Sequence, residues 1–378
     1  MKKVLPLSYI ELSEKNLVHN IIQFRNLAKV GTKFSVAIKG NAYGHGLKEV
    51  VRILNSHIDY FQVDSVEELE ALRKISKKQT FVLGYVQKED LAKAAKFGCI
   101  LSIFSIEQLV HISAIAEIRK KVQEIHLPID AYLGREGFLL EELPNILIEI
   151  KKSKFLKLSG IYAHFANIED TSDFSHAKKQ IKKYTEAIDV AEKLGFKNLL
   201  THVSATSGLL VYEKNMGIHQ LVRLGIGVYG MWPSEHLKFV YKNKMELRPV
   251  LSWKTKIAQI KTLSKGSTIG YGLTYKTKKV TKVAVIPQGY ADGLDRSFSN
   301  NGCVLIHGKK CKILGRVMMN MCVVDITHLP KTKIEDEVVI LGRQGKEEIT
   351  AEELAKRVDT INYEITTRIN PLLPRIII

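Results

Sequence analysis

Short apolar runs alternate with amphipathic stretches over about the first 230 residues, and this alternation constrains the fold more than any other feature of the sequence. Apolar runs of this kind are typical of strands buried in a parallel sheet, and the amphipathic stretches are typical of helices that cover it. The stretch 65–72 has such a helical pattern. Strands are predicted at 8–12, 34–38, 60–63, 80–83, 100–104, 124–129, 158–163, 199–203 and 221–228.

Eight or nine strand–helix repeats in this length favour a (β/α)8 barrel of the TIM type, which usually takes about 250 residues. A doubly wound open sheet is the alternative, because it is built from the same repeats. No GxGxxG sequence follows the first predicted strand, which argues against the open sheet. Ser13 is predicted to cap the first helix, which should reach about Val30.

The pattern changes after about Leu237, where apolar residues recur at every second position. One helix is predicted there, from Thr350 to Val358, with Glu353 completing a capping box. Because 378 residues exceed the usual size of one core, we expect two domains, 1–237 with the barrel and 238–378 with a mostly antiparallel β fold. Strands of the second domain are predicted at 250–260, 280–287, 303–307, 312–317, 322–326 and 338–341.

Composition narrows the functional classes. The net charge of +18 suggests nucleic acid, but the lysines are spread along the chain and accompany no DNA- or RNA-binding motif, so we expect no nucleic-acid partner. The N-terminus is too short and polar for a signal peptide and no run could span a membrane, so a cytoplasmic location without membrane contact is expected. The four cysteines lack metal-ligand spacing, which favours reduced core thiols and no metal.

The predicted strand 34–38 ends on a lone lysine, Lys39, followed by the glycine-rich segment 40–46 with Tyr43. A lysine placed this way either caps the strand and points into water, or supplies an amine for Schiff-base chemistry. This segment alone does not decide between the two.

Other polar residues fall at the carboxyl ends of the predicted strands, where barrel enzymes place their functional groups. Each has an ordinary structural explanation, such as a core histidine or a surface ion pair. Their shared location instead indicates one site that combines an amine, cationic side chains and a pocket of a size to hold a phosphate. These residues are Lys39, Tyr43, Arg135, His164, Thr206 and Arg223.

The segment 35–46, Ser-Val-Ala-Ile-Lys-Gly-Asn-Ala-Tyr-Gly-His-Gly, closely resembles the cofactor-attachment motif of the bacterial alanine racemases. The resemblance extends over essentially the whole chain and implies a pyridoxal 5′-phosphate enzyme with a barrel and a β domain. Further matching segments, in the family's order, are 160–166, 223–230, 269–272, 286–293, 315–320 and 360–364.

The resemblance implies a two-base racemisation of L- and D-alanine that supplies D-alanine for peptidoglycan. Lys39 would hold the cofactor and serve as one base, and Tyr271, from the other subunit of a head-to-tail homodimer, would be the second. His164 and Arg223 would lend positive character beside Tyr271, and Arg223 would also keep the ring nitrogen unprotonated.

The remaining roles also follow from the resemblance. Phosphate would be bound by Tyr43, Thr206, Gly225, Ile226 and Tyr363. Arg135 and Met319 would meet the substrate carboxylate, and Tyr290 with Tyr363 would narrow the entrance.

Several positions depart from the family pattern. Pro128 stands where a carbamylated lysine usually fixes the arginine matched by Arg135, so chloride or a carboxylate is predicted to replace it. The stretch 131–134 also differs, Ala205 replaces an asparagine before Thr206, and Asn320 replaces an aspartate.

Alternative functions fit the sequence less well. A decarboxylase or a broad-specificity racemase of the same architecture is the alternative to an alanine racemase, but decarboxylases typically carry a Cys-Asp-Gly motif where this chain has Arg316–Asn320. A non-catalytic cofactor carrier would have the barrel alone. A nucleic-acid-binding module rests only on the net charge.

Overall fold

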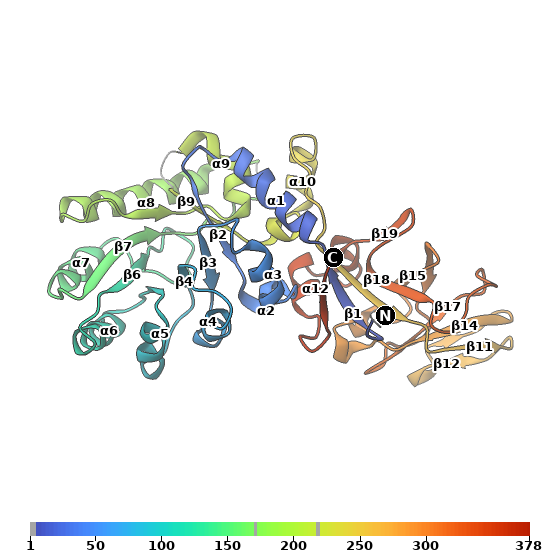
Figure 1. Cartoon of the computed structure of the whole chain (residues 1–378). Helices are drawn as coiled ribbons and strands as arrows, with labels where there is room; N and C mark the ends of the chain where they lie inside the picture. The colour runs from blue at the N-terminus through green and yellow to red at the C-terminus, as the bar shows by residue number, and fades with distance from the viewer. Residues whose placement is uncertain (1–4, 170–171, 217–219) are drawn as a thin grey trace. The chain divides into compact units, whose positions relative to one another are not determined.

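Eight parallel strands form the barrel predicted for the first part of the chain (Figure 1). Neighbouring strands pair in the order β8-β7-β6-β5-β4-β3-β2-β9. Strands β8 and β9 also approach each other, because the Gln220 and Arg223 N–H groups donate to the carbonyls of Thr201 and Ser204 at 2.9 and 3.0 Å. The strands are β2 (Lys33–Ala37), β3 (Tyr60–Val63), β4 (Thr80–Val82), β5 (Ile100–Ser102), β6 (Gln123–Pro128), β7 (Leu156–Tyr162), β8 (Leu200–His202) and β9 (Leu221–Leu224).

The computed structural model describes residues 5–169, 172–216 and 220–378. It divides into two compact units, a barrel unit of residues 18–39 and 50–247 and a β unit of residues 1–17, 40–49 and 248–378. The segment 40–49, directly after Lys39, thus groups with the second part of the chain. The predicted domain bounds of 1–237 and 238–378 stay a prediction.

Helices follow most of the barrel strands, as the amphipathic stretches predicted. Serines cap several of them, since the Ser65 and Ser105 hydroxyls accept from the N–H groups of Glu68 and Gln108. The predicted cap Ser13 is confirmed by a 3.2 Å bond from the Asn16 N–H. The helices are α1 (Glu14–Leu27), α3 (Leu47–Leu54), α4 (Val66–Arg73), α5 (Leu91–Phe97), α6 (Ile106–Ile118), α7 (Leu143–Lys151), α8 (Ser175–Lys193), α9 (Thr206–Met216) and α10 (Glu235–Tyr241).

The first predicted strand is present but belongs to the other sheet. Strand β1 (Tyr9–Leu12) pairs antiparallel with β10 (Leu251–Lys256) and parallel with β20 (Arg375–Ile377). Counting the run 8–12 among the barrel repeats was therefore wrong. A buried apolar run has the same sequence pattern in either sheet, and only long-range pairing decides between them.

The β unit is mostly antiparallel, as predicted. Its largest sheet has the order β16-β15-β18-β10-β1-β20, with β19 beside β18, and two smaller sheets are β11-β14-β17 and β12-β13. The remaining strands are β11 (Gln259–Leu263), β12 (Thr268–Ile269), β13 (Tyr275–Lys276), β14 (Thr281–Ile286), β15 (Cys303–Ile306), β16 (Lys309–Lys312), β17 (Cys322–Asp325), β18 (Glu337–Gln344) and β19 (Glu347–Ile349).

Three predictions for the β unit failed. The run 250–260 is not one strand, because β10 ends at Lys256 and β11 begins at Gln259 in another sheet. The run 312–317 is not a strand, because β16 ends at Lys312 and only Ile313 forms an isolated bridge, to Val324. A second helix, α12 (Asn362–Thr367), was missed beside the predicted α11 (Ala351–Arg357). The predicted cap of α11 is confirmed by the 3.1 Å bond from the Glu353 N–H to the Thr350 hydroxyl.

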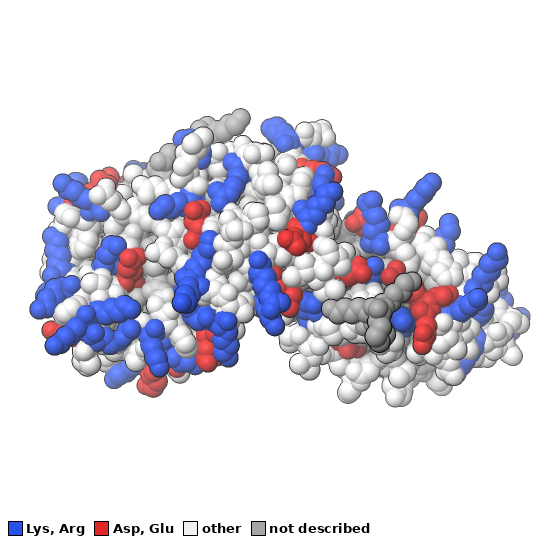
Figure 2. Space-filling view, in the orientation of Figure 1, with Lys and Arg blue, Asp and Glu red and all other residues white. Residues whose placement is uncertain are grey.

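The remaining compositional predictions concern thiols, membranes and charge. All four cysteines are free and buried, in agreement with reduced core thiols. Within the described residues no helix is long and apolar enough to cross a membrane. Figure 2 shows lysine and arginine side chains scattered over the drawn face among uncharged and acidic residues.

Candidate active site

The barrel mouth carries the predicted lysine beside a carboxylate. Lys39 follows β2, and its Nζ lies 3.1 Å from Oδ1 of Asp64, the residue directly after β3. The Lys39 side chain is 47% exposed, so this amine is within reach of a small molecule. Sequence reasoning missed Asp64, although its place at the end of a predicted strand was the available signal.

A left-handed turn follows Lys39. Gly40, Asn41, Ala42 and Tyr43 have φ values of 59°, 53°, 55° and 53°. Three consecutive non-glycine residues in this region are costly, so the surrounding structure must hold the turn in place. The Gly44 N–H closes it by donating to the Gly40 carbonyl at 3.0 Å.

Two tyrosines predicted to bind phosphate meet within the β unit. The ring centroids of Tyr43, in the left-handed turn, and Tyr363, in α12, are 6.0 Å apart. Gly44 packs beside them, since a Cβ at that position would lie 1.8 Å from the Thr366 carbonyl oxygen. The turn after Lys39 is therefore built against α12.

Three further predicted phosphate residues come together at the ends of β8 and β9. Thr206 begins α9, and Ile226 begins the 3-10 turn η2 (Ile226–Tyr229). The Gly225 N–H donates to the Thr206 hydroxyl at 3.1 Å and joins the two loops. Barrels commonly bind phosphate at the loops after their last two strands, where helix N-termini direct N–H groups outward.

The donor set fits pyridoxal phosphate. The barrel unit offers an accessible amine for the aldehyde and N-terminal N–H groups for the phosphate. The buried Ser204 hydroxyl, in the loop after β8, has no hydrogen-bond partner in the described part of the chain. Such an unsatisfied polar group beside a helix N-terminus is in keeping with a polar ligand.

Arg223 is the buried cation of the site. From β9, its Nη1 donates to Nδ1 and the carbonyl of His202 at 2.6 and 2.9 Å. Its Nη2 donates to the Ala163 carbonyl at 2.7 Å and to Nδ1 of His164 at 3.1 Å. Burial lowers the pKa of Arg223 to about 10, so it remains protonated at neutral pH.

His164 differs in charge from what was predicted. Burial, with the Arg223 guanidinium beside it, lowers the pKa of His164 to about 3. The imidazole is therefore neutral at neutral pH, and because its Nδ1 accepts from Arg223, its proton is on Nε2. The positive character predicted for both residues comes from Arg223 alone.

Arg135, for which chloride or a carboxylate was predicted as partner in place of a lysine at position 128, pairs with the residue next to it in the chain. Its Nε and Nη2 both donate to the Glu136 carboxylate, the second at 2.6 Å. Asp130, just beyond β6, accepts from the Leu133 and Gly134 N–H groups at 2.9 and 3.0 Å and shapes the loop before Arg135. Arg135 is thus paired with a carboxylate, and whether Glu136 takes the role of the usual lysine, rather than chloride, stays a prediction.

The other predicted residues lie on the surface of the β unit. Tyr271 is 72% exposed in the 3-10 turn η3 (Tyr271–Leu273), and Met319 and Tyr290 are also exposed. The Tyr290 and Ala291 N–H groups donate to the Met318 and Met319 carbonyls at 3.0 and 2.9 Å, which ties the two loops together. How these residues meet the barrel residues stays a prediction.

Sequence reasoning gave no role to two histidines inside the barrel. His126 on β6 and His202 on β8 are fully buried, with His126 Nδ1 2.8 Å from His202 Nε2. Both were visible in the sequence, but a histidine in an apolar strand is more often a core residue than a functional one.

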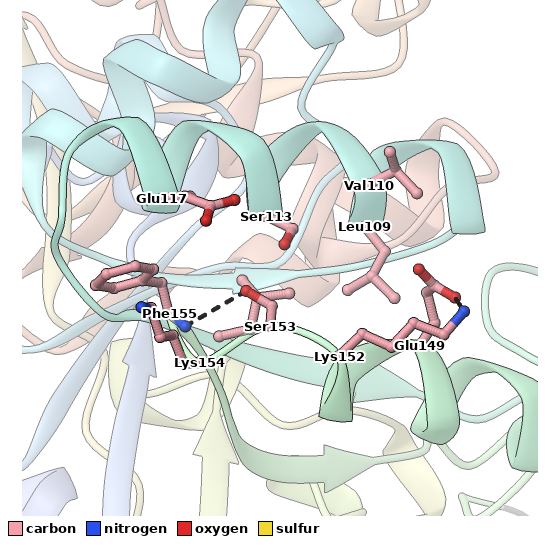
Figure 3. A pocket seen from close by; sticks show the side chains of 10 residues that line it. Leu109, Val110, Ser113, Glu117, Glu149, Lys152, Ser153, Lys154 and Phe155 are labelled. Carbon is pink, nitrogen blue, oxygen red and sulfur yellow. Dashed lines mark hydrogen bonds and ion pairs between the residues drawn. The ribbon is translucent and has the colours of Figure 1, made fainter.

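A separate groove of about 210 Å³ lies on the outside of the barrel between α6 and the end of α7 (Figure 3). Leu109 and Leu156 contribute apolar surface to it, and a 2.6 Å ion pair joins Lys152 and Glu149 at its edge. None of the predicted site residues lines this groove.

Comparison with known proteins matches two family models. One, described as alanine racemase, N-terminal domain, covers residues 12–233, and the other, alanine racemase, C-terminal domain, covers residues 250–377. An alanine racemase of Leptospira interrogans is 36% identical over 98% of this chain and 96% of its own length. Alanine racemase 2 of Caldanaerobacter subterraneus is 34% identical over 98% of this chain and 94% of its own length.

Solved structures of alanine racemases are also similar to this chain. Alanine racemase of Clostridium difficile 630 superposes with a TM-score of 0.93 at 31% identity, covering 100% of this chain and 97% of its own. The structure of alanine racemase from Bacillus anthracis with bound L-Ala-P superposes with a TM-score of 0.92 at 29% identity. The match covers 100% of this chain and 96% of that one.

Proposed function

The chain belongs to the alanine racemase family of isomerases, and on that premise we propose that it interconverts L- and D-alanine with pyridoxal 5′-phosphate as cofactor. The observation that carries the proposal is one barrel mouth that combines the accessible Lys39 amine, the buried Arg223 cation and the Thr206–Gly225 junction. We propose further that the reaction uses two bases and supplies D-alanine for peptidoglycan in the cytoplasm.

The cofactor, when bound, supplies an aldehyde that links to amines and a ring that withdraws electrons from the α-carbon of a linked amino acid. Lys39 would hold it, because its Nζ is the amine at the end of β2. Thr206, Gly225 and Ile226 would bind the phosphate through a hydroxyl and the backbone. Tyr43 and Tyr363 are proposed as further phosphate-binding residues.

Arg223 would set the electronic character of the site. Its two terminal nitrogens donate to five acceptors on His202, Val203, Ala163 and His164, so the guanidinium has a fixed direction. Held near the cofactor's ring nitrogen, this cation would disfavour a proton there. Arg223 would in this way favour return of the proton to the α-carbon of the linked amino acid.

Racemisation needs a proton removed from one face of the α-carbon and returned to the other. Lys39 would act on one face and Tyr271 of a second copy of the chain on the other. The exposure of Tyr271, and of Leu273 in the same turn, supports a surface that pairs with another subunit. The neutral His164 and cationic Arg223 favour phenolate over phenol at a tyrosine placed against them.

Substrate contacts would come from Arg135 and Met319. Glu136 holds the Arg135 guanidinium with two hydrogen bonds, which fixes its orientation without a lysine at position 128. The Met319 backbone N–H would receive the substrate carboxylate, and Tyr290 would restrict the entrance to a small side chain.

The test is conversion of L-alanine to D-alanine by protein supplied with the cofactor. Wild-type protein should racemise alanine and show the visible absorbance of a lysine-linked cofactor, and Lys39→Ala should lose both. Lys33→Ala is the matched control, because Lys33 lies at the opposite end of the same strand. Folded wild-type protein that binds the cofactor but leaves L-alanine unchanged would refute the proposal.

A further inference from the structure

A continuous line of hydrogen bonds runs from the site into the barrel core. Arg223 Nη1 lies 2.6 Å from His202 Nδ1, and His202 Nε2 lies 2.8 Å from His126 Nδ1. All three side chains are buried. His126 is therefore connected to the guanidinium through one intervening imidazole.

The direction of every bond in this line is determined by Arg223. A guanidinium only donates, so His202 Nδ1 accepts and the His202 proton must be on Nε2. His202 Nε2–H then donates to His126 Nδ1, which leaves the His126 proton on its own Nε2. Burial lowers the pKa of His126 to about 3 and that of His202 well below its usual value, so each ring carries one proton.

The far end of the line is unsatisfied. His126 Nε2 is buried and has no hydrogen-bond partner in the described part of the chain. The His126 ring packs directly against Gly160 on the neighbouring strand β7. A side chain at position 160 would clash with it, because a Cβ there would lie 2.6 Å from His126 Nε2. A buried donor without a partner is costly and calls for an explanation.

Aromatic packing accounts for the plane of His202 but not for its protonation. Tyr162 stacks on the His202 ring with centroids 4.9 Å apart and planes at 10°. Phe81 packs on His126 and His202 with centroids at 4.9 and 5.5 Å. These contacts are apolar and would hold a ring of either tautomer.

We propose that His126 is a positioning residue: by accepting the His202 Nε2–H bond it fixes the tautomer of His202 that receives Arg223, and so orients the guanidinium in the site. This rests on the proposed function of Arg223. Without that acceptor, the His202 proton is no longer stabilised on Nε2, and its transfer to Nδ1 would place a donor against the Arg223 N–H. The guanidinium would then lose one of its side-chain acceptors.

Two substitutions separate the hydrogen bond from packing. Asparagine can place its amide oxygen near the position of the imidazole Nδ1, so His126→Asn keeps the acceptor but leaves a cavity. His126→Phe fills the space but has no acceptor. Phe81→Leu is the matched control, because it disturbs packing on both histidines and removes no polar atom.

The first measurement is the His202 tautomer, read from side-chain nitrogen NMR shifts of histidine-labelled protein without cofactor. Wild type, His126→Asn and Phe81→Leu should show His202 protonated on Nε2. His126→Phe should show a substantial Nδ1-protonated population. This arm does not depend on catalysis, so it decides the structural part of the proposal even if the chain does not racemise alanine.

The second measurement is steady-state kinetics of the cofactor-loaded enzyme. His126→Phe should lower kcat about tenfold, with KM within about twofold of wild type, because a cation that acts in the transition state is less well fixed. His126→Asn and Phe81→Leu should keep kcat within about threefold of wild type while lowering the melting temperature.

Two results would overturn the proposal. One is a His126→Phe enzyme with wild-type kcat and an unchanged His202 tautomer. The other is a His126→Asn enzyme that loses as much kcat as His126→Phe although its His202 tautomer is retained, since packing alone would then explain both.

Discussion

Arg223 Nη2 donates to Nδ1 of His164 across 3.1 Å, and this bond requires a neutral imidazole at the barrel mouth. The burial that keeps His164 neutral also keeps Arg223 from other counter-ions, since the groups to which it donates are carbonyls and imidazoles. Among the described residues, the hydrogen-bond acceptors of the Arg223 guanidinium are thus all uncharged, and no carboxylate bonded to it cancels its charge. An anionic ligand or a phenolate is what such a cation attracts.

Acid should destabilise the protein through its buried histidines. The pKa values of His126 and His164 are lowered to about 3, and that of His45 to about 4, mainly by burial. The unfolded chain takes up protons below about pH 6.5, which these folded residues do not, so the free energy of unfolding falls as the pH falls. Above pH 7 this effect is absent.

One histidine can be isolated by comparing wild type with His126→Phe. Between pH 7 and 5.5 wild type should lose about 1.2 kcal/mol more unfolding free energy than the variant, because the variant lacks one such group. Urea unfolding at the two pH values measures this. An equal loss in both proteins would mean that His126 is protonated in the native state.

The left-handed turn after Lys39 should depend on Gly44. Gly44→Ala places a methyl group 1.8 Å from the Thr366 carbonyl oxygen, so the turn must move away from α12. Gly31→Ala is the control, because Gly31 has a similar φ of 89° and open space around it. We expect Gly31→Ala to cost about 1 kcal/mol of unfolding free energy and Gly44→Ala several times more.

Cofactor binding provides a second readout of the same pair. Gly44→Ala should weaken binding of pyridoxal phosphate, since Tyr43 lies in the displaced turn, and Gly31→Ala should not. Equal stability and cofactor affinity in the two variants would contradict the arrangement of the turn against α12.

Glu136 should orient Arg135 without stabilising the fold. The pair is exposed, so Glu136→Gln should change the free energy of unfolding by no more than about 1 kcal/mol. Alanine KM should nevertheless rise several-fold, because the guanidinium loses its bidentate partner. Glu149→Gln, which breaks the ion pair with Lys152 on the outside of the barrel, is the control and should leave KM unchanged. Wild-type KM in Glu136→Gln would remove Glu136 from the site.

A shared site predicts complementation between inactive variants. Lys39→Ala and Tyr271→Phe each disable every site of their own homodimer. In an exchanged mixture, half of the dimers should be mixed, and each mixed dimer should contain one intact site, which restores about a quarter of wild-type activity. No recovery after verified subunit exchange would place Lys39 and Tyr271 of one site on the same chain.

The sequence predicted the parts of the site that depend on strand order. Parallel strands bring their carboxyl ends to one edge, so Lys39, His164, Thr206 and Arg223 could be grouped from the sequence pattern alone. Asp64 was missed although it obeys the same rule, because one acidic residue after a strand carries no motif.

Other features depend on long-range geometry that a linear pattern does not contain. Strand β1 pairs with β10 and β20, which are more than 200 residues away. The hydrogen bonds that connect His126 to Arg223 through His202 require β6, β8 and β9 to be in register. They also require Gly160 on β7 to leave space for the His126 ring. The neutrality of His164 follows from burial, which its sequence neighbours do not reveal.

The most direct test of the two-base account is deuterium wash-in at the α-carbon of each alanine isomer in heavy water. In wild type both isomers should exchange. In Tyr271→Phe, exchange from L-alanine should be strongly suppressed while exchange from D-alanine continues through Lys39. Equal and undiminished exchange from both isomers in Tyr271→Phe would contradict the account.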